Sequence, residues 1–260
     1  SADAPGTYAN GIGTNLDIID RVGDAALSTS NSQSYNMIPD DKIPYVPQYV
    51  GDQISNTYSM AFDGTNYFDL GNVSSLNFER TDAFSISAWV KRVGSGTTQF
   101  IFSKATNSSP YTGYSIYINP SNQIASNINI SYASNHLSVN GNSTLNTSWN
   151  HVCVTYDGSS NASGIKLYVN GSKETTSSTG QASITGTLSN SYPVNIAARN
   201  SSDLFFNGQI DEVAIFDTAL TADQIKFDLY KPTSEGTNQT ADVVNNLNLP
   251  TPVAWYRMGD

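Results

Sequence analysis

Short runs of alternating apolar and polar residues follow one another along most of this chain, and turn signals separate them. In residues 84–90 (FSISAWV), Phe, Ile, Ala and Val fall on one face of an extended chain, whereas Ser, Ser and Trp fall on the other. The pairs Asp157-Gly158, Asn170-Gly171 and Asn207-Gly208 close later runs. Strands at roughly 8–12-residue spacing are typical of antiparallel sandwiches and barrels. The pattern therefore predicts an all-β fold in which each strand buries one face.

Two of the runs, 58–62 and 67–70, flank the turn signal Asp63-Gly64, and this spacing predicts that they pair as a hairpin. The other expected strands are 84–90, 99–104, 114–118, 124–132, 149–156, 165–169, 194–198, 205–216 and 252–258. One short helix is expected near 221–230. There Thr221 and Gln224 have capping-box spacing, and Pro232 ends the helix.

Composition divides the chain into three parts. Residues 1–55 are rich in proline, glycine and asparagine, and we expect an irregular segment that packs on the sandwich. Residues 56–231 hold the strand series. Residues 232–260 are polar and loop-like until the last expected strand, 252–258, which would complete this sandwich or a neighbouring one.

Charged residues make up only 13% of the chain, and the net charge is −10 with 12 lysines and arginines. Phosphate recognition needs clustered basic residues, so nucleic acid is excluded as a partner. No apolar stretch approaches the ~20 residues that span a bilayer, so membrane insertion is not expected. An acidic surface suits a cation or a neutral glycan, or serves solubility alone. The single cysteine, Cys153, forms no intrachain disulfide and is expected to face inward as a small apolar residue.

Six stretches occur in a fixed order between about residues 56 and 230. They are 60–64 (MAFDG), 84–91 (FSISAWVK), 149–158 (WNHVCVTYDG), 165–171 (IKLYVNG), 208–216 (GQIDEVAIF) and 219–225 (ALTADQI). Together they resemble the laminin-G-like, concanavalin-A-like lectin/glucanase superfamily, including its versions in marine microbial and viral surface proteins. The resemblance implies a two-sheet antiparallel jelly-roll sandwich.

The end of the chain carries a second resemblance. Residues 253–260 (VAWYRMGD) look like the strand that opens such domains, where it precedes a segment like residues 16–23. Here that strand comes last. The boundaries could cut across a tandem array, or the strand could complete this sandwich or a neighbour's by head-to-tail strand exchange. An arbitrary boundary with a frayed tail is the third alternative.

Catalysis is not expected. Related glucanases carry a Glu-x-Asp-x-x-Glu pattern on one strand, and this chain lacks it. The nearest run is Asp211-Glu212, and neighbours on a regular strand face opposite sides, so they could not act together on one substrate. No nucleophile elbow or phosphate loop is present either.

Calcium is the cofactor that the resemblance suggests, in a structural role. It points to Asp211, at the start of the "I-D-E-V" strand, with Asp63 able to face it. Hard cations take carboxylate and carbonyl oxygens, which these residues could supply. The alternative is that Asp63 forms an Asx turn before Gly64 and Asp211 binds backbone amides.

Four tyrosines lie in or beside polar, asparagine-rich segments: Tyr111, Tyr114, Tyr117 and Tyr132. Exposed rings that stack on sugars, with amides and carboxylates around the hydroxyls, are what glycan binding requires. Tyr117 shares its strand face with Ser115, so it is expected to be more exposed than Ile116. We therefore predict that the four rings bind ligand on the concave sheet. The alternative is that they are ordinary sheet-surface tyrosines.

These features lead to a non-catalytic module that binds a carbohydrate or another cell-surface ligand. It would belong to a larger secreted, cell-surface or virion-appendage adhesion protein. The rival is a structural or assembly module that makes protein–protein contacts, by head-to-tail self-association or with a neighbouring domain through strand 252–258. A glycoside hydrolase is a third reading, and it would need a carboxylate pair on the concave face.

Overall fold

The computed structural model describes residues 58–106, 108–200, 203–230 and 242–257. Four further strands lie outside these ranges: β1 (Leu16–Ile19), β2 (Ala26–Thr29), β3 (Ile54–Ser55) and β17 (Gln239–Thr240). Strand β1 pairs with β2 inside a unit of residues 1–50, and β3 pairs with β17 inside a second unit of residues 51–260. The predicted packing of residues 1–55 on the sandwich, and the loop expected just after residue 231, lie outside the described residues.

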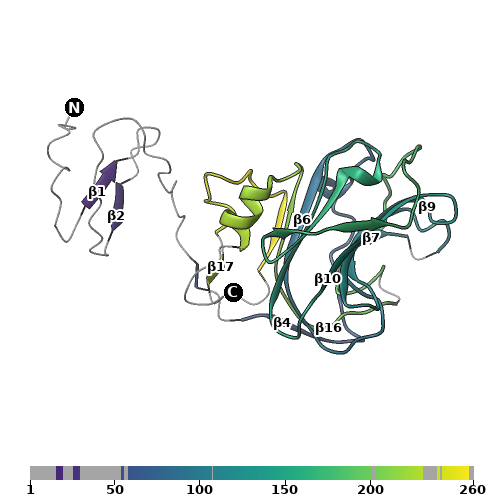
Figure 1. The fold of residues 1–260 in the computed structure, drawn as a ribbon, viewed down its shortest axis with the longest axis horizontal. Helices are drawn as coiled ribbons and strands as arrows, with labels where there is room; N and C mark the ends of the chain where they lie inside the picture. Colours follow the sequence, from purple (N-terminus) through teal and green to yellow (C-terminus); the bar gives the residue numbers. More distant parts are fainter. Residues whose placement is uncertain are drawn as a thin grey trace. The chain divides into compact units, whose positions relative to one another are not determined.

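Two antiparallel sheets of seven strands form the second unit (Figure 1). The first, called the β8 sheet, has the order β14-β10-β9-β8-β7-β15-β5, and the second, called the β6 sheet, has the order β13-β12-β11-β6-β16-β18, with β4 also paired to β16. The β8 sheet contains β5 (Phe68–Asp69), β7 (Gln99–Ala105), β8 (Gly113–Ile118), β9 (Gln123–Ser131), β10 (Asn135–Thr144), β14 (Thr176–Ser178) and β15 (Val194–Ile196). The β6 sheet contains β4 (Met60–Asp63), β6 (Phe84–Arg92), β11 (Asn150–Tyr156), β12 (Ile165–Val169), β13 (Ser172–Lys173), β16 (Asn207–Phe216) and β18 (Ala254–Tyr256). The predicted all-β sandwich is confirmed.

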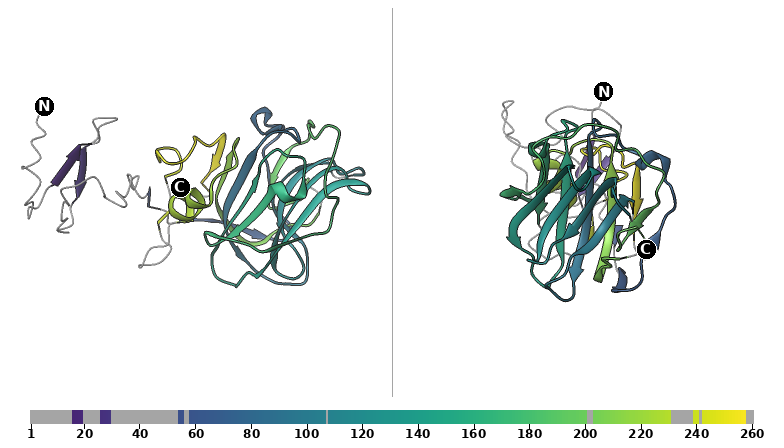
Figure 2. Two further views of the ribbon diagram at one scale, coloured as in Figure 1. Left: turned by 45° about the horizontal axis from the view of Figure 1, so that its top comes forward. Right: turned by 90° about the vertical axis from the view of Figure 1, so that its right-hand side faces the viewer.

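The two sheets face each other (Figure 2), and alternating apolar side chains of their strands fill the core between them. In β6, Phe84, Ile86, Ala88 and Val90 enter one buried cluster, as the sequence predicted. Strand β8 contributes Tyr114 and its inward neighbours from the opposite sheet. Phe84 stacks on Phe78 with ring centroids 5.1 Å apart. Burial of these large rings and branched chains, at about 25 cal/mol per Å² of apolar surface, is the main stabilisation of the fold.

The hairpin predicted around Asp63-Gly64 is wrong. Strand β4 pairs with β16, whereas β5 pairs with β15, so the two runs belong to different sheets. The chain crosses the sandwich here because Phe62 and Phe68 both pack into the core, with their rings edge to face at 5.6 Å. The chain does turn at Asp63-Gly64, but this turn connects a strand of one sheet to a strand of the other sheet.

A second apolar cluster covers the outward face of the β6 sheet. The π-type helix η4 (Gln224–Tyr230) places Ile225 and Leu229 there, with Val243 and Leu249 from the following segment. Thr221 and Gln224 exchange the hydrogen bonds of a capping box, at 2.9 and 3.2 Å. Helix and C-terminal segment lie together on one side of the sandwich (Figure 1). Two further helical turns, η2 (Ser74–Leu76) and η3 (Ala162–Gly164), occur in loops.

Cys153 belongs to this second cluster and not to the core between the sheets. Val152 and Val154, its neighbours on β11, face the core, so Cys153 faces outward and is buried beneath the helix. The expectation that it faces inward is therefore wrong, although its apolar surroundings are as expected. Burial raises the pKa of its thiol well above the ordinary value, which keeps it protonated and unreactive.

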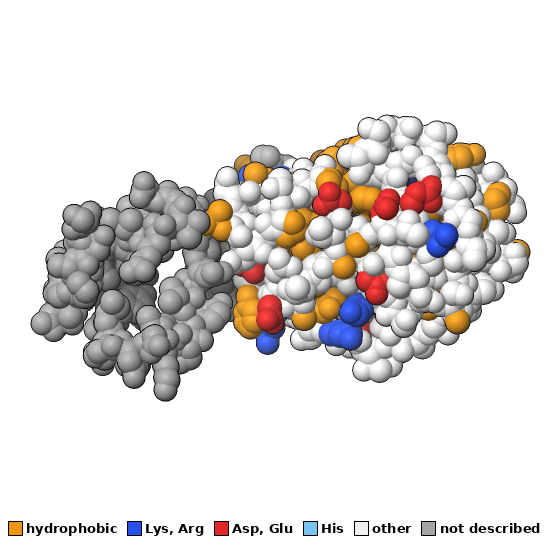
Figure 3. Space-filling view, turned by 90° about the horizontal axis from the view of Figure 1, so that it is seen from above, with side chains coloured by type: hydrophobic (Ala, Val, Ile, Leu, Met, Phe, Trp, Pro, Cys, Tyr) orange, Lys and Arg blue, Asp and Glu red, His pale blue; other side chains and the backbone are white. Residues whose placement is uncertain are grey.

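Strand β18 closes one edge of the β6 sheet within its own chain. Val213, Ala214 and Ile215 of β16 pair with Tyr256, Trp255 and Ala254. On the face that Figure 3 shows, acidic and basic side chains are few and scattered among hydrophobic and uncharged atoms. Within the described ranges, no helix has the length and apolar character needed to cross a bilayer.

Candidate functional site

A pocket of about 190 Å³ opens on the outward face of the β8 sheet. Ile116 of β8 faces the core, so Ser115 and Tyr117 face the other way. The same alternation turns Asn127 and Asn129 of β9 outward, beside Phe100 of β7. The residues that line this tyrosine pocket are Phe100, Ala105, Thr106, Tyr111, Ser115, Asn127, Asn129, Tyr132 and Arg199.

Two of the four predicted tyrosines, Tyr111 and Tyr132, form the rim of the pocket. Their rings meet edge to face with centroids 6.1 Å apart, and Tyr132 also stacks on His136 at 5.1 Å. The backbone N–H of Tyr132 donates to Pro110 O at 2.9 Å, which ties the two rim loops together. Tyr132 stays 54% exposed, so its ring is available to a ligand.

Tyr117 lies beneath the pocket as part of its support. Its ring stacks on Phe100 at 5.0 Å and 14°, and its hydroxyl donates to Asn127 Oδ1 at 3.1 Å. Burial raises the pKa of Tyr117, so the hydroxyl remains a donor at neutral pH. Tyr117 lies on the same strand face as Ser115, as predicted, but it is only 9% exposed because other side chains cover it.

Tyr114 lies on the other face of the same strand. It is 2% exposed, packs on Phe84 at 4.9 Å, and donates its hydroxyl to Leu76 O at 2.7 Å. Residues of odd and even number on β8 face opposite sides, so Tyr114 and Tyr117 cannot share a surface. The structure brings Tyr111, Tyr117 and Tyr132 together and places Tyr114 in the core.

Asn129 contributes an unusual acceptor to the pocket. Its side chain is 7% exposed, and its Oδ1 has no hydrogen-bond partner within the described part of the chain. An unsatisfied buried acceptor costs about 1–3 kcal/mol, so a ligand hydroxyl that donates to it would recover that energy. Asn127 has its Oδ1 bonded to Tyr117, which leaves its amino group as the donating part of that side chain.

Arg199 supplies a cation held in place by two neighbours. Its guanidinium makes a two-point ion pair with Asp203, through Nε to Oδ1 at 2.9 Å and through Nη2 to Oδ2. The same group lies 5.0 Å from the centroid of the Tyr111 ring. The sequence analysis missed this arginine because it lies in a loop about 70–100 residues along the chain from the strands that line the pocket. It missed Asn127 and Asn129 too, although their i, i+2 spacing on a predicted strand was a usable signal.

Asp63 and Asp211, the predicted calcium ligands, lie apart. Asp63 pairs with Asn207 of β16. Asn207 and Asp211 are four residues apart on this strand, a distance of about 13 Å between their backbones. Asp63 Oδ1 accepts from the N–H groups of Thr65 and Asn66 at 2.8 and 3.1 Å. Asp211 Oδ1 accepts from the N–H of Glu212 at 2.8 Å. One ion with Ca–O distances of 2.3–2.6 Å does not fit between these two carboxylates.

Asp211 and Glu212 do not face opposite sides, contrary to the sequence argument. A β-bulge interrupts the register between Asp211 and Ala214, and Glu212 takes a φ of 51°. The bulge inserts one residue and turns both carboxylates to the outward face of the β6 sheet. Glu212 is held by Trp255 Nε1 at 2.6 Å and Arg257 Nε at 3.4 Å. Burial and, less strongly, the nearby Asp211 raise the pKa of Glu212.

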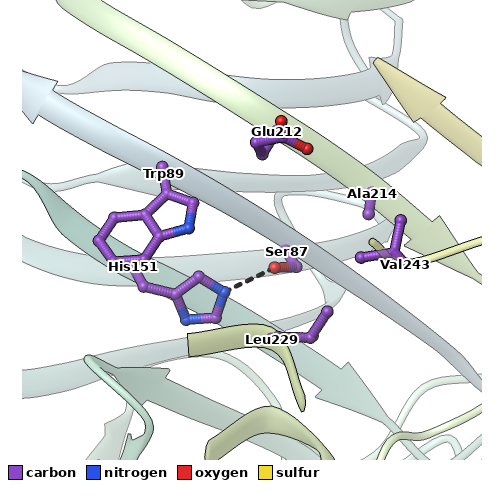
Figure 4. Close-up of a pocket in the computed structure, with 7 residues that line it drawn as sticks. All are labelled: Ser87, Trp89, His151, Glu212, Ala214, Leu229 and Val243. Carbon is purple, nitrogen blue, oxygen red and sulfur yellow. Dashed lines mark hydrogen bonds between the residues drawn. The ribbon is translucent and has the colours of Figure 1, made fainter. Parts of the chain in front are cut away.

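Beside this bulge, Ser87 and His151 form a buried pair (Figure 4). Ser87 Oγ and His151 Nε2 are 2.8 Å apart, and the adjoining cavity of about 10 Å³ has room for about one water. Glu212 lies apart from the imidazole (Figure 4), and His151 Nδ1 has no partner among the described residues. Burial lowers the pKa of His151 to about 3. A serine–histidine pair that is covered and lacks an orienting carboxylate is not arranged for hydrolysis.

Two antiparallel seven-stranded sheets, with an aromatic, amide-rich pocket on one of them, define the class of two-sheet jelly-roll sandwiches. The family model of the concanavalin A-like lectin/glucanases superfamily matches residues 62–226. The chain belongs to this family. No curated protein sequence matches it significantly.

Solved structures share the fold at low identity. The CBM40 module of the Ruminococcus gnavus IT-sialidase, bound to α2,3- or α2,6-sialyllactose, has a TM-score of 0.52 at 14% identity and covers 65% of this chain and 95% of that chain. The leech intramolecular trans-sialidase has a TM-score of 0.52 at 16% identity, covering 70% of this chain and 28% of that one. The NanB sialidase of Streptococcus pneumoniae has a TM-score of 0.50 at 15% identity, covering 66% and 28%.

Proposed function

We propose that this domain is a non-catalytic carbohydrate-binding module and that the tyrosine pocket is its binding site. The observation that carries the proposal is the pocket itself: the exposed ring of Tyr132 and the half-buried ring of Tyr111 lie beside a buried amide oxygen that has no partner among the described residues. Rings offer a flat apolar surface to a sugar face, and amides and hydroxyls bind its edges. Membership of the lectin/glucanase family and the fold shared with CBM40 support the same reading.

The setting we propose is adhesion. A module of this kind would act in a larger extracellular, cell-surface or virion-appendage protein, where it would hold its parent to a glycan-bearing surface. The acidic, weakly charged composition fits a glycan partner better than nucleic acid or an anionic membrane.

Tyr132→Ala is expected to weaken glycan binding at least tenfold, which corresponds to about 1.4 kcal/mol. The ring is more than half exposed, so its loss removes ligand contact with little effect on folding. A glycan array followed by calorimetric titration of the best ligand would measure the change. Tyr192→Ala is the matched control, because Tyr192 is exposed and does not line the pocket. Absence of binding to any glycan by the wild-type domain would reject the proposal.

The glycan array also tests whether binding requires calcium. Because Asp63 and Asp211 lie too far apart to share an ion, a calcium ion would not be bound by both of them. Running the array with calcium and with EDTA shows whether binding depends on a divalent cation.

A second candidate function is assembly through strand β18. The observation that favours it is the position of this strand, at a sheet edge with only three paired residues. Exchange of such an edge strand between copies would join domains head to tail. A glycoside hydrolase lacks comparable support, because Glu212 is already held by Trp255 and Arg257.

A further inference from the structure

The charge arrangement of the tyrosine pocket bears on the class of sugar it accepts. Arg199 is the only basic residue among those that line the pocket. Acidic sugars carry a carboxylate, and arginine binds carboxylates best through two parallel N–H···O bonds. The state of this one guanidinium therefore decides whether the pocket suits an acidic or a neutral sugar.

Asp203 already occupies the fork of Arg199. Its two carboxylate oxygens face Nε and Nη2 of the guanidinium, the geometry that an acidic ligand would need. Tyr111 covers one flat face of the same group at 5.0 Å. A ligand carboxylate would have to displace Asp203 or bind the Nη1–Nη2 edge next to it, and either step is opposed by like charge at close range.

The remaining polar groups favour hydroxyls. Asn129 Oδ1 is a buried acceptor for which the described ranges provide no donor, so a ligand donor would satisfy it. A sugar hydroxyl can donate to it, whereas an ionised carboxylate cannot. Thr106, Ser115 and Asn127 add neutral groups that bind hydroxyls without charge. The net charge of −10 further disfavours an anionic ligand.

From these observations we infer that the pocket selects a neutral sugar unit and discriminates against sialic and uronic acids. The inference rests on the proposed carbohydrate function. At about 190 Å³ the cavity is smaller than the ~300–1,000 Å³ of sites for drug-sized ligands. It therefore holds about one sugar ring, with the rest of the glycan outside. This domain shares its fold with the CBM40 module bound to sialyllactose, but we expect the two to differ in the charge of the sugar that they accept.

The test pairs neutral glycans with their acidic counterparts, such as lactose with 3′- and 6′-sialyllactose, on an array and by titration. The wild-type domain is expected to bind the neutral member of its best pair at least tenfold more tightly. Asp203→Asn removes the negative charge beside the Arg199 guanidinium and is expected to raise affinity for the acidic member about tenfold. Asp223→Asn, an equal charge change on an exposed residue before η4, should leave both affinities unchanged.

The outcomes separate the two claims. Preference of the wild-type domain for acidic glycans overturns the inference and leaves the carbohydrate function in place. Failure to bind any glycan rejects the function itself. A neutral preference that Asp203→Asn does not alter would show that the Arg199–Asp203 pair is not its cause. Thermal melting of each variant checks that the fold is retained.

Discussion

Removal of residues 251–260 is expected to lower the free energy of unfolding by about 3–5 kcal/mol, the range for breaking a buried ion pair by losing one partner. The deletion takes away Trp255 and Arg257, which hold the carboxylate of Glu212. It also leaves one edge of β16 without its partner strand and uncovers the core residues against which Val253 and Tyr256 pack. Urea unfolding of the full chain and of residues 1–250 measures the difference.

Two control variants test whether the loss of stability arises from the buried Glu212 carboxylate losing its partners. Adding Glu212→Gln to the shortened chain should recover part of the loss, because a neutral amide is cheaper to leave buried than a carboxylate. Trp255→Phe in the full chain removes only the N–H donor and should cost about 1–3 kcal/mol. If the shortened chain is as stable as the full one, strand β18 contributes little to closing the sheet.

The same deletion tests assembly. If β18 exchanges between copies, the full chain should form dimers or longer species at high concentration, and the shortened chain should not. A synthetic peptide of residues 251–260 should then restore stability when added in trans. A full chain that remains monomeric at all concentrations, and is unaffected by the peptide, would reject strand exchange.

Lowering the pH from 7 to 5 is expected to reduce the stability by about 2 kcal/mol, chiefly through His151. Its pKa falls from 6.5 in the unfolded chain to about 3 in the buried site, so the unfolded state binds the proton first. The stabilisation is complete above pH 6.5 and is lost at about 1.4 kcal/mol per pH unit as the pH falls toward 3. His151→Gln should flatten this slope whatever its effect at pH 7. An unchanged slope in the variant would contradict the assignment.

Other titratable side chains differ from His151 in the direction of their effect on stability or in the pH range over which it occurs. The pKa of Glu212 is raised by burial, so its protonation stabilises the folded state as the pH falls, and Glu212→Gln should steepen the slope. Hydrogen bonds lower the pKa values of Asp63 and Asp157, and their contribution is lost only below about pH 4. His136 has a pKa lowered by burial and acts in the same direction as His151, so His136→Gln is a useful second variant.

The fold was predictable because its central strands alternate clearly and match family motifs in order. Strand β10, among the longest, was not predicted. It is built from Asn, Ser, Thr and Gly with Leu137 and Val139 as its buried apolar residues, so its composition resembles a loop. Pairing with β9 on one side and β14 on the other holds this segment in a strand conformation that its own sequence does not predict. Tertiary pairing outweighs local preference in such a strand.

The candidate site was predictable only in part, for a related reason. Tyrosines beside polar segments pointed to the sheet that carries the tyrosine pocket. Alternation along β8 decides which face each side chain lies on, and it places Tyr117 and Tyr114 on opposite faces. Arg199 comes from a loop remote in sequence, and no local pattern reveals its pairing with Tyr111. The error at Asp211-Glu212 came from assuming a regular strand where the chain has a bulge.

Helix η4 and residues 242–256 cover the outward face of the β6 sheet, whereas the outward face of the β8 sheet carries the tyrosine pocket. If this pocket is the glycan site that we propose, a domain that binds through it alone is monovalent. Linking copies raises their effective concentration at a surface, and avidity can then exceed single-site affinity by about 10²–10⁴. The strength with which a parent protein holds a glycan-coated surface would therefore depend on the number and spacing of its copies more than on the affinity of each pocket.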